Sequence, residues 1–401
     1  MDQFAVRNNN LVIGNTELTQ IAERAGQTPI YAYDRQLLTK RVADLRKAMP
    51  EDLKIHYAMK ANPMPAIVQH MANITDGLDV ASAGEMKVAL DTTMPAKNIS
   101  MAGPGKRPEE LRQAVAAGIT INVESFNELE ILATQSEQLG ITANVAVRIN
   151  PAFELKASGM KMGGGPKQFG IDEEQVPDTL KRIKALDLHF KGFHIFSGSQ
   201  NLKAESIIEA QQKSIALAIC LADDCPSPIE KLNIGGGYGI PYFPGDTRLD
   251  TVAVGEALEK SMQNARNQIP SAEVIIELGR YLVGEAGIYV CRIIDKKISR
   301  GQIFLVCDGG LHHHLAASGN FGQVIRKNYP TAIGNKMEAD IKETVNIVGP
   351  LCTPLDILAD RIELPKAEIG DLVVIFQSGA YGITASPINF LTQPGAIEIL
   401  V

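Results

Sequence analysis

The chain has 401 residues, of which 45% are hydrophobic, and a formal net charge of −7. This length exceeds one ordinary core and predicts two domains, or a barrel with an appended domain. The acidic charge argues against a nucleic-acid or anionic-membrane partner. No apolar run approaches the ~20 residues of a transmembrane helix, and MDQFAVRNNN at the start lacks a signal-peptide layout. We therefore expect a cytoplasmic protein.

Short apolar runs alternate with helical patterns through the first 280 residues. Stretches such as 107–117, 127–139 and 204–222 repeat apolar residues at three- and four-residue steps, the period of a helix. Eight alternating units predict a parallel (β/α)₈ barrel of the TIM type over residues 30–280. The candidate strands are 53–59, 78–81, 98–101, 119–123, 143–149, 189–195, 231–234 and 273–277.

The rhythm changes near residue 280, where helical patterns become rare. We expect residues 281–401 to form a mainly antiparallel β domain, joined by the strand-like residues 1–29. The glycine-rich stretch 159–170 predicts a long mobile loop. The strand-like runs are 287–294, 302–307, 343–348, 371–376 and 396–400.

Polar or glycine-rich sequence follows every predicted barrel strand, at the end where barrels of this type hold their chemistry. Lys60 in IHYAMKANP either reaches solvent from a strand end or is an amine kept from bulk water so that it can react. The other candidates are Asp79, Ser82, Gly103, Gly105, Glu124, Ser125, Arg148, Asn150, His194, Phe196, Ser199, Gly235, Gly236, Gly237, Glu277, Gly279 and Arg280.

Three short motifs suggest ligands. NIGGGYG is not a dinucleotide fingerprint because Ile240 holds the last glycine position, but amides at 235–237 could cradle one phosphate monoester. Adjacent side chains diverge, so His312, His313 and His314 do not predict a metal site; they could present cationic or hydrogen-bonding groups to an anion. The five scattered cysteines predict reduced thiols, with neither disulfides nor zinc.

Ten motifs in one order decide the resemblance. They are YAMKANP, LDVASAGEM, RINP, KQFGI, GFHIFSGSQ, NIGGGYG, ELGRYLVGEAG, CDGG, GPLCTPLD and SGAYG. From about residue 25 to 395 the chain resembles the pyridoxal-phosphate-dependent decarboxylases with an alanine-racemase-type barrel, which include diaminopimelate, ornithine and arginine decarboxylases. The resemblance implies pyridoxal 5′-phosphate as cofactor and a homodimer with shared active sites.

The resemblance also implies roles for individual residues. Lys60 would bond to the cofactor aldehyde, and partial burial would depress its pKa. Glu277 would keep the pyridine nitrogen protonated, which favours decarboxylation over racemisation. Cys352 and Asp356 would enter the site from the second subunit, with the cysteine as proton donor rather than a buried small hydrophobe. Ser199, Gly235, Gly236, Gly237, Gly279, Arg280 and Tyr381 would hold the phosphate, and Asp79 and Arg148 are further cofactor candidates.

Two departures from the family pattern bear on the substrate. Phe196 stands where relatives stack a histidine on the cofactor, with His194 two residues earlier. Thr353 stands where relatives pair an acid with a distal ammonium, and losing a hydrogen bond to a charged group costs about 1.5–3 kcal/mol. The segment CDGGLHHHLAASGNFG also lacks an arginine common in diaminopimelate decarboxylases. We therefore expect a substrate without a free distal ammonium.

These departures favour decarboxylation of a conjugated L-amino acid. The favoured substrate is a citryl-diamino acid, such as N-citrylornithine in carboxylate siderophore biosynthesis, because His312–His314 would suit a carboxylate-rich group. The alternatives are a glutamyl group on an acyl-carrier protein, and free diaminopimelate or ornithine. Two alternatives belong to other functional classes: an amino-acid racemase and a non-catalytic cofactor-binding regulator. The presence of Lys60, Glu277 and Cys352 argues against both.

Overall fold

The computed structural model describes residues 3–153, 160–161, 163–321, 323 and 326–401. The predicted loop 159–170 falls partly outside these residues, at 159 and 162. The chain divides into two compact units. One comprises Arg41–Ile240 and Thr247–Leu282, and the other comprises Met1–Lys40, Pro241–Asp246 and Val283–Val401.

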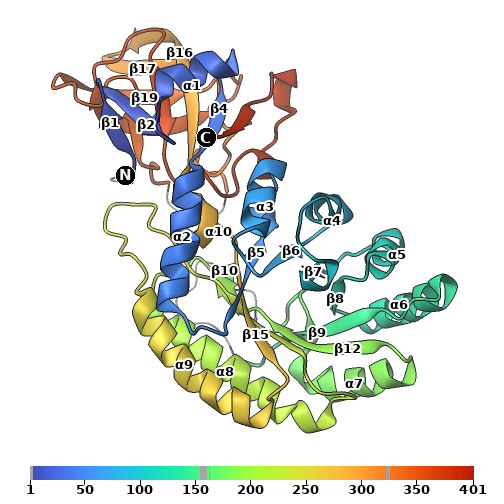
Figure 1. The fold of residues 1–401 in the computed structure, drawn as a ribbon. Helices are drawn as coiled ribbons and strands as arrows, with labels where there is room; N and C mark the ends of the chain where they lie inside the picture. Colours follow the sequence, from blue (N-terminus) through green and yellow to red (C-terminus); the bar gives the residue numbers. More distant parts are fainter. Residues whose placement is uncertain (1–2, 154–159, 162, 322, 324–325) are drawn as a thin grey trace. The chain divides into compact units, whose positions relative to one another are not determined.

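The first unit is a closed barrel of parallel strands, as predicted (Figure 1). Neighbouring strands pair in parallel all the way round, and the pairing of β8 with β9 completes the ring. The short strand β11 (Ile171–Asp172) adds to β9 outside this ring. The barrel strands are β5 (Lys54–Ala58), β6 (Gly77–Val80), β7 (Ile99–Met101), β8 (Thr120–Val123), β9 (Asn144–Asn150), β12 (His189–Ile195), β14 (Lys231–Gly236) and β15 (Glu273–Leu278).

Helices surround the barrel strands (Figure 1). Several begin at a side-chain cap: Ser82 accepts a hydrogen bond from the amide of Glu85, and Ser125 accepts one from the amide of Glu128. These caps place the helix starts directly after β6 and β8. The helices are α2 (Arg35–Ala48), α3 (Pro65–Ala72), α4 (Ala83–Leu90), α5 (Pro108–Ala117), α6 (Phe126–Leu139), α7 (Val176–Ala185), α8 (Ala204–Cys220), α9 (Thr251–Gln268) and the short α10 (Arg280–Val283).

The second unit is a mainly antiparallel β structure, again as predicted. The exceptions are two parallel pairs, β17 with β19 and β22 with β4. Its core gathers Leu18, Ile288, Val374 and Phe376. Its elements are β1 (Ala5–Arg7), β2 (Asn10–Ile13), β3 (Thr16–Glu17), α1 (Leu18–Ala25), β4 (Ile30–Tyr33), β16 (Gly287–Ser299), β17 (Gln302–Cys307), β18 (Thr331–Ile333), β19 (Lys342–Val348), β20 (Ile357–Pro365), β21 (Leu372–Ile375) and β22 (Ile397–Leu400).

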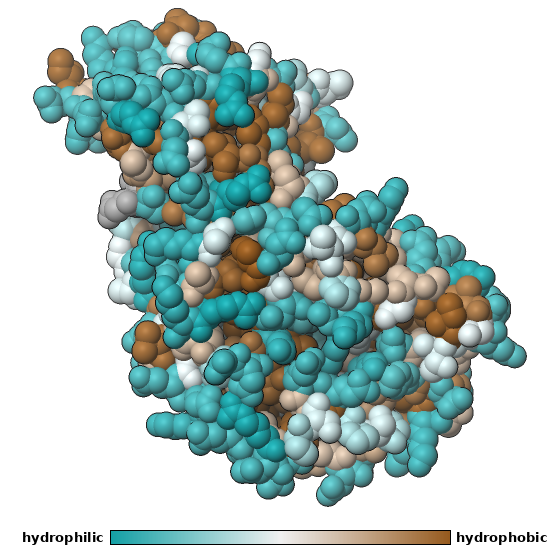
Figure 2. Space-filling model, in the orientation of Figure 1, coloured by the Kyte–Doolittle hydropathy of each residue, from teal (hydrophilic) through white to brown (hydrophobic). Residues whose placement is uncertain are grey.

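Hydrophilic residues dominate the face drawn in Figure 2, with hydrophobic ones interspersed. Across the described ranges, none of the helices has both the length and the apolar character needed to cross a membrane.

Candidate active site

Lys60 lies at the carboxyl end of β5, in a short 3₁₀ turn over Met59–Ala61. A side-chain hydrogen bond stabilises this turn: the hydroxyl of Tyr57 donates to the carbonyl of Asn62 at 2.7 Å. Nζ of Lys60 lies 3.4 Å from Oε1 of Glu277 and 5.4 Å from the centre of the Phe196 ring. Its side chain is 41% exposed. The structure therefore presents an accessible amine beside a carboxylate and an aromatic face.

Glu277 is buried near the end of β15, the barrel neighbour of β5. Its Oε2 lies 3.0 Å from Nε2 of His194 and accepts a hydrogen bond of 3.4 Å from Nδ2 of Asn233. Burial by itself would raise the pKa of Glu277, but the charge of Lys60, followed by the adjacent imidazole of His194, holds that pKa below its ordinary value. Glu277 is therefore ionised at neutral pH.

His194 and Phe196 divide two tasks between them. His194 belongs to β12 itself rather than following it, and its buried imidazole faces Glu277. Phe196 comes directly after the strand and lies beside the amine of Lys60. The ring of Phe196 thus lies beside the reactive amine, and its stacking on a cofactor stays a prediction, whereas His194 lies against the carboxylate of Glu277.

The glycines that end β14 form a tight cradle. Gly235 and Gly237 have φ values of +72° and +75°, which side chains rarely adopt. A Cβ on Gly236 would collide with the carbonyl of Glu277, and one on Gly237 with the carbonyl of Gly198. Beside them, the buried Oγ of Ser199 has no hydrogen-bond partner among the described residues. The amide of Gly235 already donates a hydrogen bond of 2.9 Å to Oδ1 of Asn233. The close glycine backbone and the orphaned hydroxyl of Ser199 beside it suit an oxyanion.

Gly279 permits a second close approach. A Cβ there would lie 2.8 Å from that of Ala61, next to Lys60. The following residue, Arg280, is the first residue of α10, two positions after the end of β15, the strand that carries Glu277.

Asp79 and Arg148 already have partners within the barrel. Oδ1 of Asp79 accepts a hydrogen bond of 2.6 Å from Ser100 and lies 3.1 Å from Nδ1 of His56. Nη1 of Arg148 donates a hydrogen bond of 2.9 Å to Oε1 of Glu124. The structure thus places both residues in the polar filling of the barrel, and their expected contacts with a cofactor stay predictions.

Sequence reasoning missed Asn233, which donates a hydrogen bond to Glu277 in this site. Asn233 precedes Gly235 by two positions and Glu277 lies on the next strand, so strand alternation already indicated that Asn233 faces the same interior.

The remaining candidates belong to the β unit. Cys352 is exposed and Thr353 is half-buried, both in the loop between β19 and β20. Asp356 is 3% exposed, and its oxygens accept hydrogen bonds from the amides of Leu311 and Leu351. Tyr381 follows β21 with φ +53°. The structure therefore exposes the thiol and buries the nearby acid.

All three adjacent histidines are buried. His313 bonds the carbonyl of Pro394 at 2.7 Å, and His314 bonds the hydroxyl of Ser378 at 2.8 Å. Burial lowers the pKa of His312 to about 4 and that of His314 to about 3, and it lowers the pKa of His313 as well. The lowered pKa values argue against the cationic alternative at neutral pH, and the hydrogen-bonding alternative stays a prediction.

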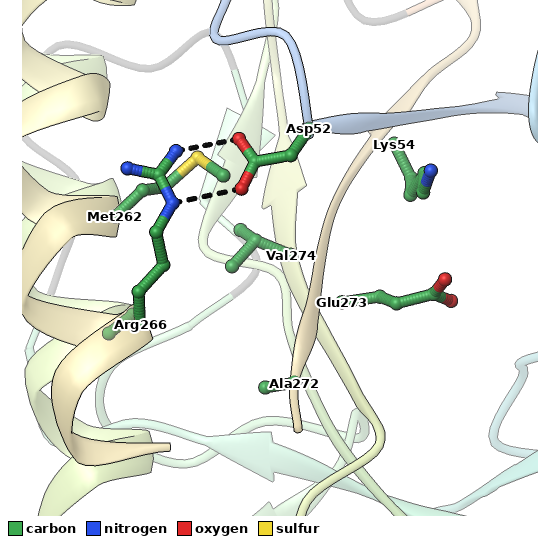
Figure 3. A pocket seen from close by; sticks show the side chains of 8 residues that line it. Asp52, Lys54, Met262, Arg266, Ala272, Glu273 and Val274 are labelled. Atoms are coloured by element: carbon green, nitrogen blue, oxygen red, sulfur yellow. Dashed lines mark hydrogen bonds and ion pairs between the residues drawn. The ribbon is translucent and has the colours of Figure 1, made fainter. Parts of the chain in front are cut away.

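A separate pocket of about 210 Å³ lies at the other end of the barrel strands (Figure 3). Lys54 and Glu273, the first residues of β5 and β15, line it. A two-point ion pair between Asp52 and Arg266, at 2.7 and 2.9 Å, borders it. This pocket does not belong to the Lys60 site, because it lies where these strands begin rather than where they end.

Residues 35–284 match the family model described as the pyridoxal-binding domain of pyridoxal-dependent decarboxylases. The chain belongs to the pyridoxal-dependent decarboxylases. It is therefore an enzyme of the carboxy-lyase type, and its cofactor is pyridoxal phosphate. The site fits that group: the glycine cradle and Ser199 suit its phosphate, Lys60 its aldehyde, and ionised Glu277 its ring nitrogen.

Relatives of this decarboxylase differ in substrate. A Niallia circulans decarboxylase of the L-glutamyl BtrI acyl-carrier protein is 37% identical over 394 residues, covering 97% of this chain and 92% of its own. A Staphylococcus aureus decarboxylase of 2-((L-alanin-3-ylcarbamoyl)methyl)-2-hydroxybutanedioate is 31% identical, covering 91% and 92%. The solved diaminopimelate decarboxylase of Methanocaldococcus jannaschii has a TM-score of 0.89 at 28% identity, covering 100% and 92%.

Proposed function

We propose that this enzyme removes the α-carboxylate of an L-amino acid whose distal end is conjugated. The observation that carries the proposal is Thr353, which stands beside the exposed Cys352 where a charged partner would be needed for a free ammonium. A hydroxyl cannot replace an acid in such a pair. Both a glutamyl thioester and an amide-linked diamino acid lack that ammonium.

The barrel residues would divide the chemistry. Bound pyridoxal phosphate supplies a ring that withdraws electrons from the carbon losing CO₂. Lys60 would provide the amine that holds the cofactor through its aldehyde. Glu277, ionised and supported by His194, holds a proton on the ring nitrogen. This electronic arrangement favours loss of CO₂ over racemisation.

The β unit would supply the final proton. The exposed thiol of Cys352 is the candidate donor to the carbon that has lost CO₂. We propose that it works in the barrel of a second subunit, so that the active form is a homodimer with shared sites. Cysteine-to-serine replacement, Cys352→Ser, should slow product formation while leaving cofactor absorbance unchanged.

A glutamyl group on a carrier protein is our first candidate substrate. The relative at 37% identity acts on such a group, and the neutral His312–His314 cluster removes the electrostatic reason for preferring a citryl group. A citryl-diamino acid is the second candidate, favoured by the amide-linked substrate of the Staphylococcus aureus relative.

The test is a competition assay for CO₂ release. The panel contains γ-glutamyl carrier protein, N-citrylornithine, N-citryl-diaminopropionate, and free ornithine, lysine and diaminopimelate. We expect a conjugate to have the highest kcat/KM, and faster turnover of a free diamino acid would overturn the proposal. Deuterium exchange at the α-carbon without CO₂ release would indicate a racemase instead.

A further inference from the structure

The loop that joins β19 to β20, residues 349–356, has a closed base and an exposed tip. At its base, the amide of Gly349 donates a hydrogen bond of 3.1 Å to the carbonyl of Asp356. At its tip, the amide of Thr353 donates one of 2.8 Å to the carbonyl of Leu351, and Cys352 is exposed. The tip thus carries both residues expected to meet the substrate.

The side chain of Asp356 points back into the unit and joins this loop to a second segment. Oδ2 accepts a hydrogen bond of 2.9 Å from the amide of Leu351, directly before Cys352. Oδ1 accepts one of 2.6 Å from the amide of Leu311, which is 45 residues away along the chain. Both carboxylate oxygens are therefore engaged by backbone donors and are turned away from solvent.

Two glycines make room for this carboxylate. A Cβ on Gly310 would collide with Oδ1 of Asp356, and a Cβ on Gly349 would collide with Oδ2. The approach of both backbones is so close because the carboxylate fills the space between the two segments. Any larger residue at either position would push the carboxylate out of place.

A second tie joins segment 310–318 to Ile357, the first residue of β20 after the loop. Nε of Arg326 donates a hydrogen bond of 3.1 Å to the carbonyl of Ser318, and Nη2 donates one of 2.8 Å to the carbonyl of Ile357. Asp356 thus accepts hydrogen bonds from two backbone amides, and Arg326 donates hydrogen bonds to two backbone carbonyls. Segment 310–318 is therefore held at Leu311 by Asp356 and at Ser318 by Arg326, and both ties reach the end of the loop where β20 begins.

We propose that Asp356 is a positioning residue, whose carboxylate fixes the loop 349–356 against segment 310–318 and so sets the place of Cys352 and Thr353. It acts through these two residues and does not bind the substrate. The inference rests on the proposed function for the roles of Cys352 and Thr353 as proton donor and specificity residue. The contacts of Asp356 themselves do not depend on a substrate. If Asp356 were purely structural, its replacement would lower the stability of the whole unit without selectively changing the accessibility of Cys352.

The test compares thiol labelling in three holoenzyme variants: Asp356→Asn, Gly310→Ala and Glu363→Gln. Asn offers one amide oxygen in place of two carboxylate oxygens, so one backbone donor loses its partner. Gly310→Ala keeps the carboxylate and displaces it. Glu363 lies exposed in β20, which makes its amide variant the matched control. Iodoacetamide labelling of Cys352 is read by peptide mass spectrometry against exposed Cys220 in the barrel unit.

We expect Asp356→Asn and Gly310→Ala to raise the Cys352-to-Cys220 labelling ratio by about threefold or more, because a loosened loop no longer holds Cys352 in the second subunit of the proposed homodimer. We expect kcat to fall about tenfold, with a smaller change in KM. Glu363→Gln should match the wild type in both. If Asp356→Asn does not fold, Gly310→Ala decides the question alone.

An unchanged labelling ratio in both variants would overturn the inference, as would equal acceleration at both cysteines. The labelling ratio needs no substrate, so the two proposals fail separately. A changed ratio in an enzyme that acts only on free diamino acids would support the positioning role and refute the conjugated substrate.

Discussion

Nζ of Lys60 lies 3.4 Å from Oε1 of Glu277, although the two residues are 217 positions apart. Barrel closure explains the distance, because β5 and β15 are adjacent strands with His56 opposite Glu277 and Tyr57 opposite Leu278. The reactive amine and the carboxylate that serves the cofactor ring therefore depend on one strand pairing.

Neutralising Glu277 should damage catalysis more than binding. We expect Glu277→Gln to lower kcat about 100-fold or more, since the ring nitrogen loses the anion that keeps it protonated. Steady-state kinetics with a cofactor titration would measure this. Glu273→Gln, on the exposed first residue of the same strand, is the control and should retain activity. Equal kcat in the two variants would count against the assigned role.

The glycine cradle should be intolerant of a single methyl group. Gly237→Ala places a side chain at φ +75° and against the carbonyl of Gly198, next to Ser199. We expect the dissociation constant of pyridoxal phosphate to rise about tenfold or more. Absorbance titration of the apoenzyme would measure it. Gly105→Ala, where a Cβ meets nothing within 4 Å, should bind the cofactor normally. Similar dissociation constants in the two variants would mean that the glycine cradle does not bind the cofactor.

An acid at position 353 should change substrate preference. We expect Thr353→Glu to raise kcat/KM for free ornithine or diaminopimelate about tenfold and to lower it for conjugates, because the new carboxylate pairs with a distal ammonium. The same assay panel would report the ratio. Thr344→Glu, on an exposed position of β19, is the matched control. An unchanged ratio in Thr353→Glu would mean that Thr353 does not determine substrate specificity.

The neutral His314 should make stability depend on pH. Burial lowers its folded pKa to about 3, whereas an unfolded histidine has a pKa of about 6.5. Between these values the unfolded chain binds a proton that the folded chain does not. The unfolding free energy should therefore fall by about 1.4 kcal/mol per unit of decreasing pH.

Urea denaturation between pH 4.5 and 7.5 would reveal this slope. We expect His314→Gln to reduce it by one proton. A slope that His314→Gln does not alter would mean that the imidazole is already charged in the folded state.

Local patterns predicted the barrel because its strands are continuous apolar runs of the kind that two-sided burial requires. They also predicted the Lys60–Glu277 site, since both residues come at strand ends that barrel closure brings together. The strand β20 was not predicted, because the alternating charges of its sequence, ILADRIELP, hide a strand with one exposed face.

Other features depend on contacts between distant segments, which no local pattern encodes. The turn of His194 toward Glu277 is decided by β15 and Asn233. The burial of Asp356 is decided by Leu311 and two glycines, and the neutral state of the histidines by the surrounding packing. Sequence reasoning assigned His194 to the cofactor and Asp356 to the substrate. The structure shows contacts of both residues within the protein, and the assigned ligand contacts stay predictions.

The central claim is that the cofactor is carried on the nitrogen of Lys60. Borohydride reduction of the holoenzyme, followed by peptide mass spectrometry, tests it most directly. We predict a phosphopyridoxyl group on Lys60, and Lys60→Ala enzyme that takes up no such label and loses about 1,000-fold or more in activity. A label on another lysine in fully active enzyme, or undiminished turnover by Lys60→Ala, would contradict the account.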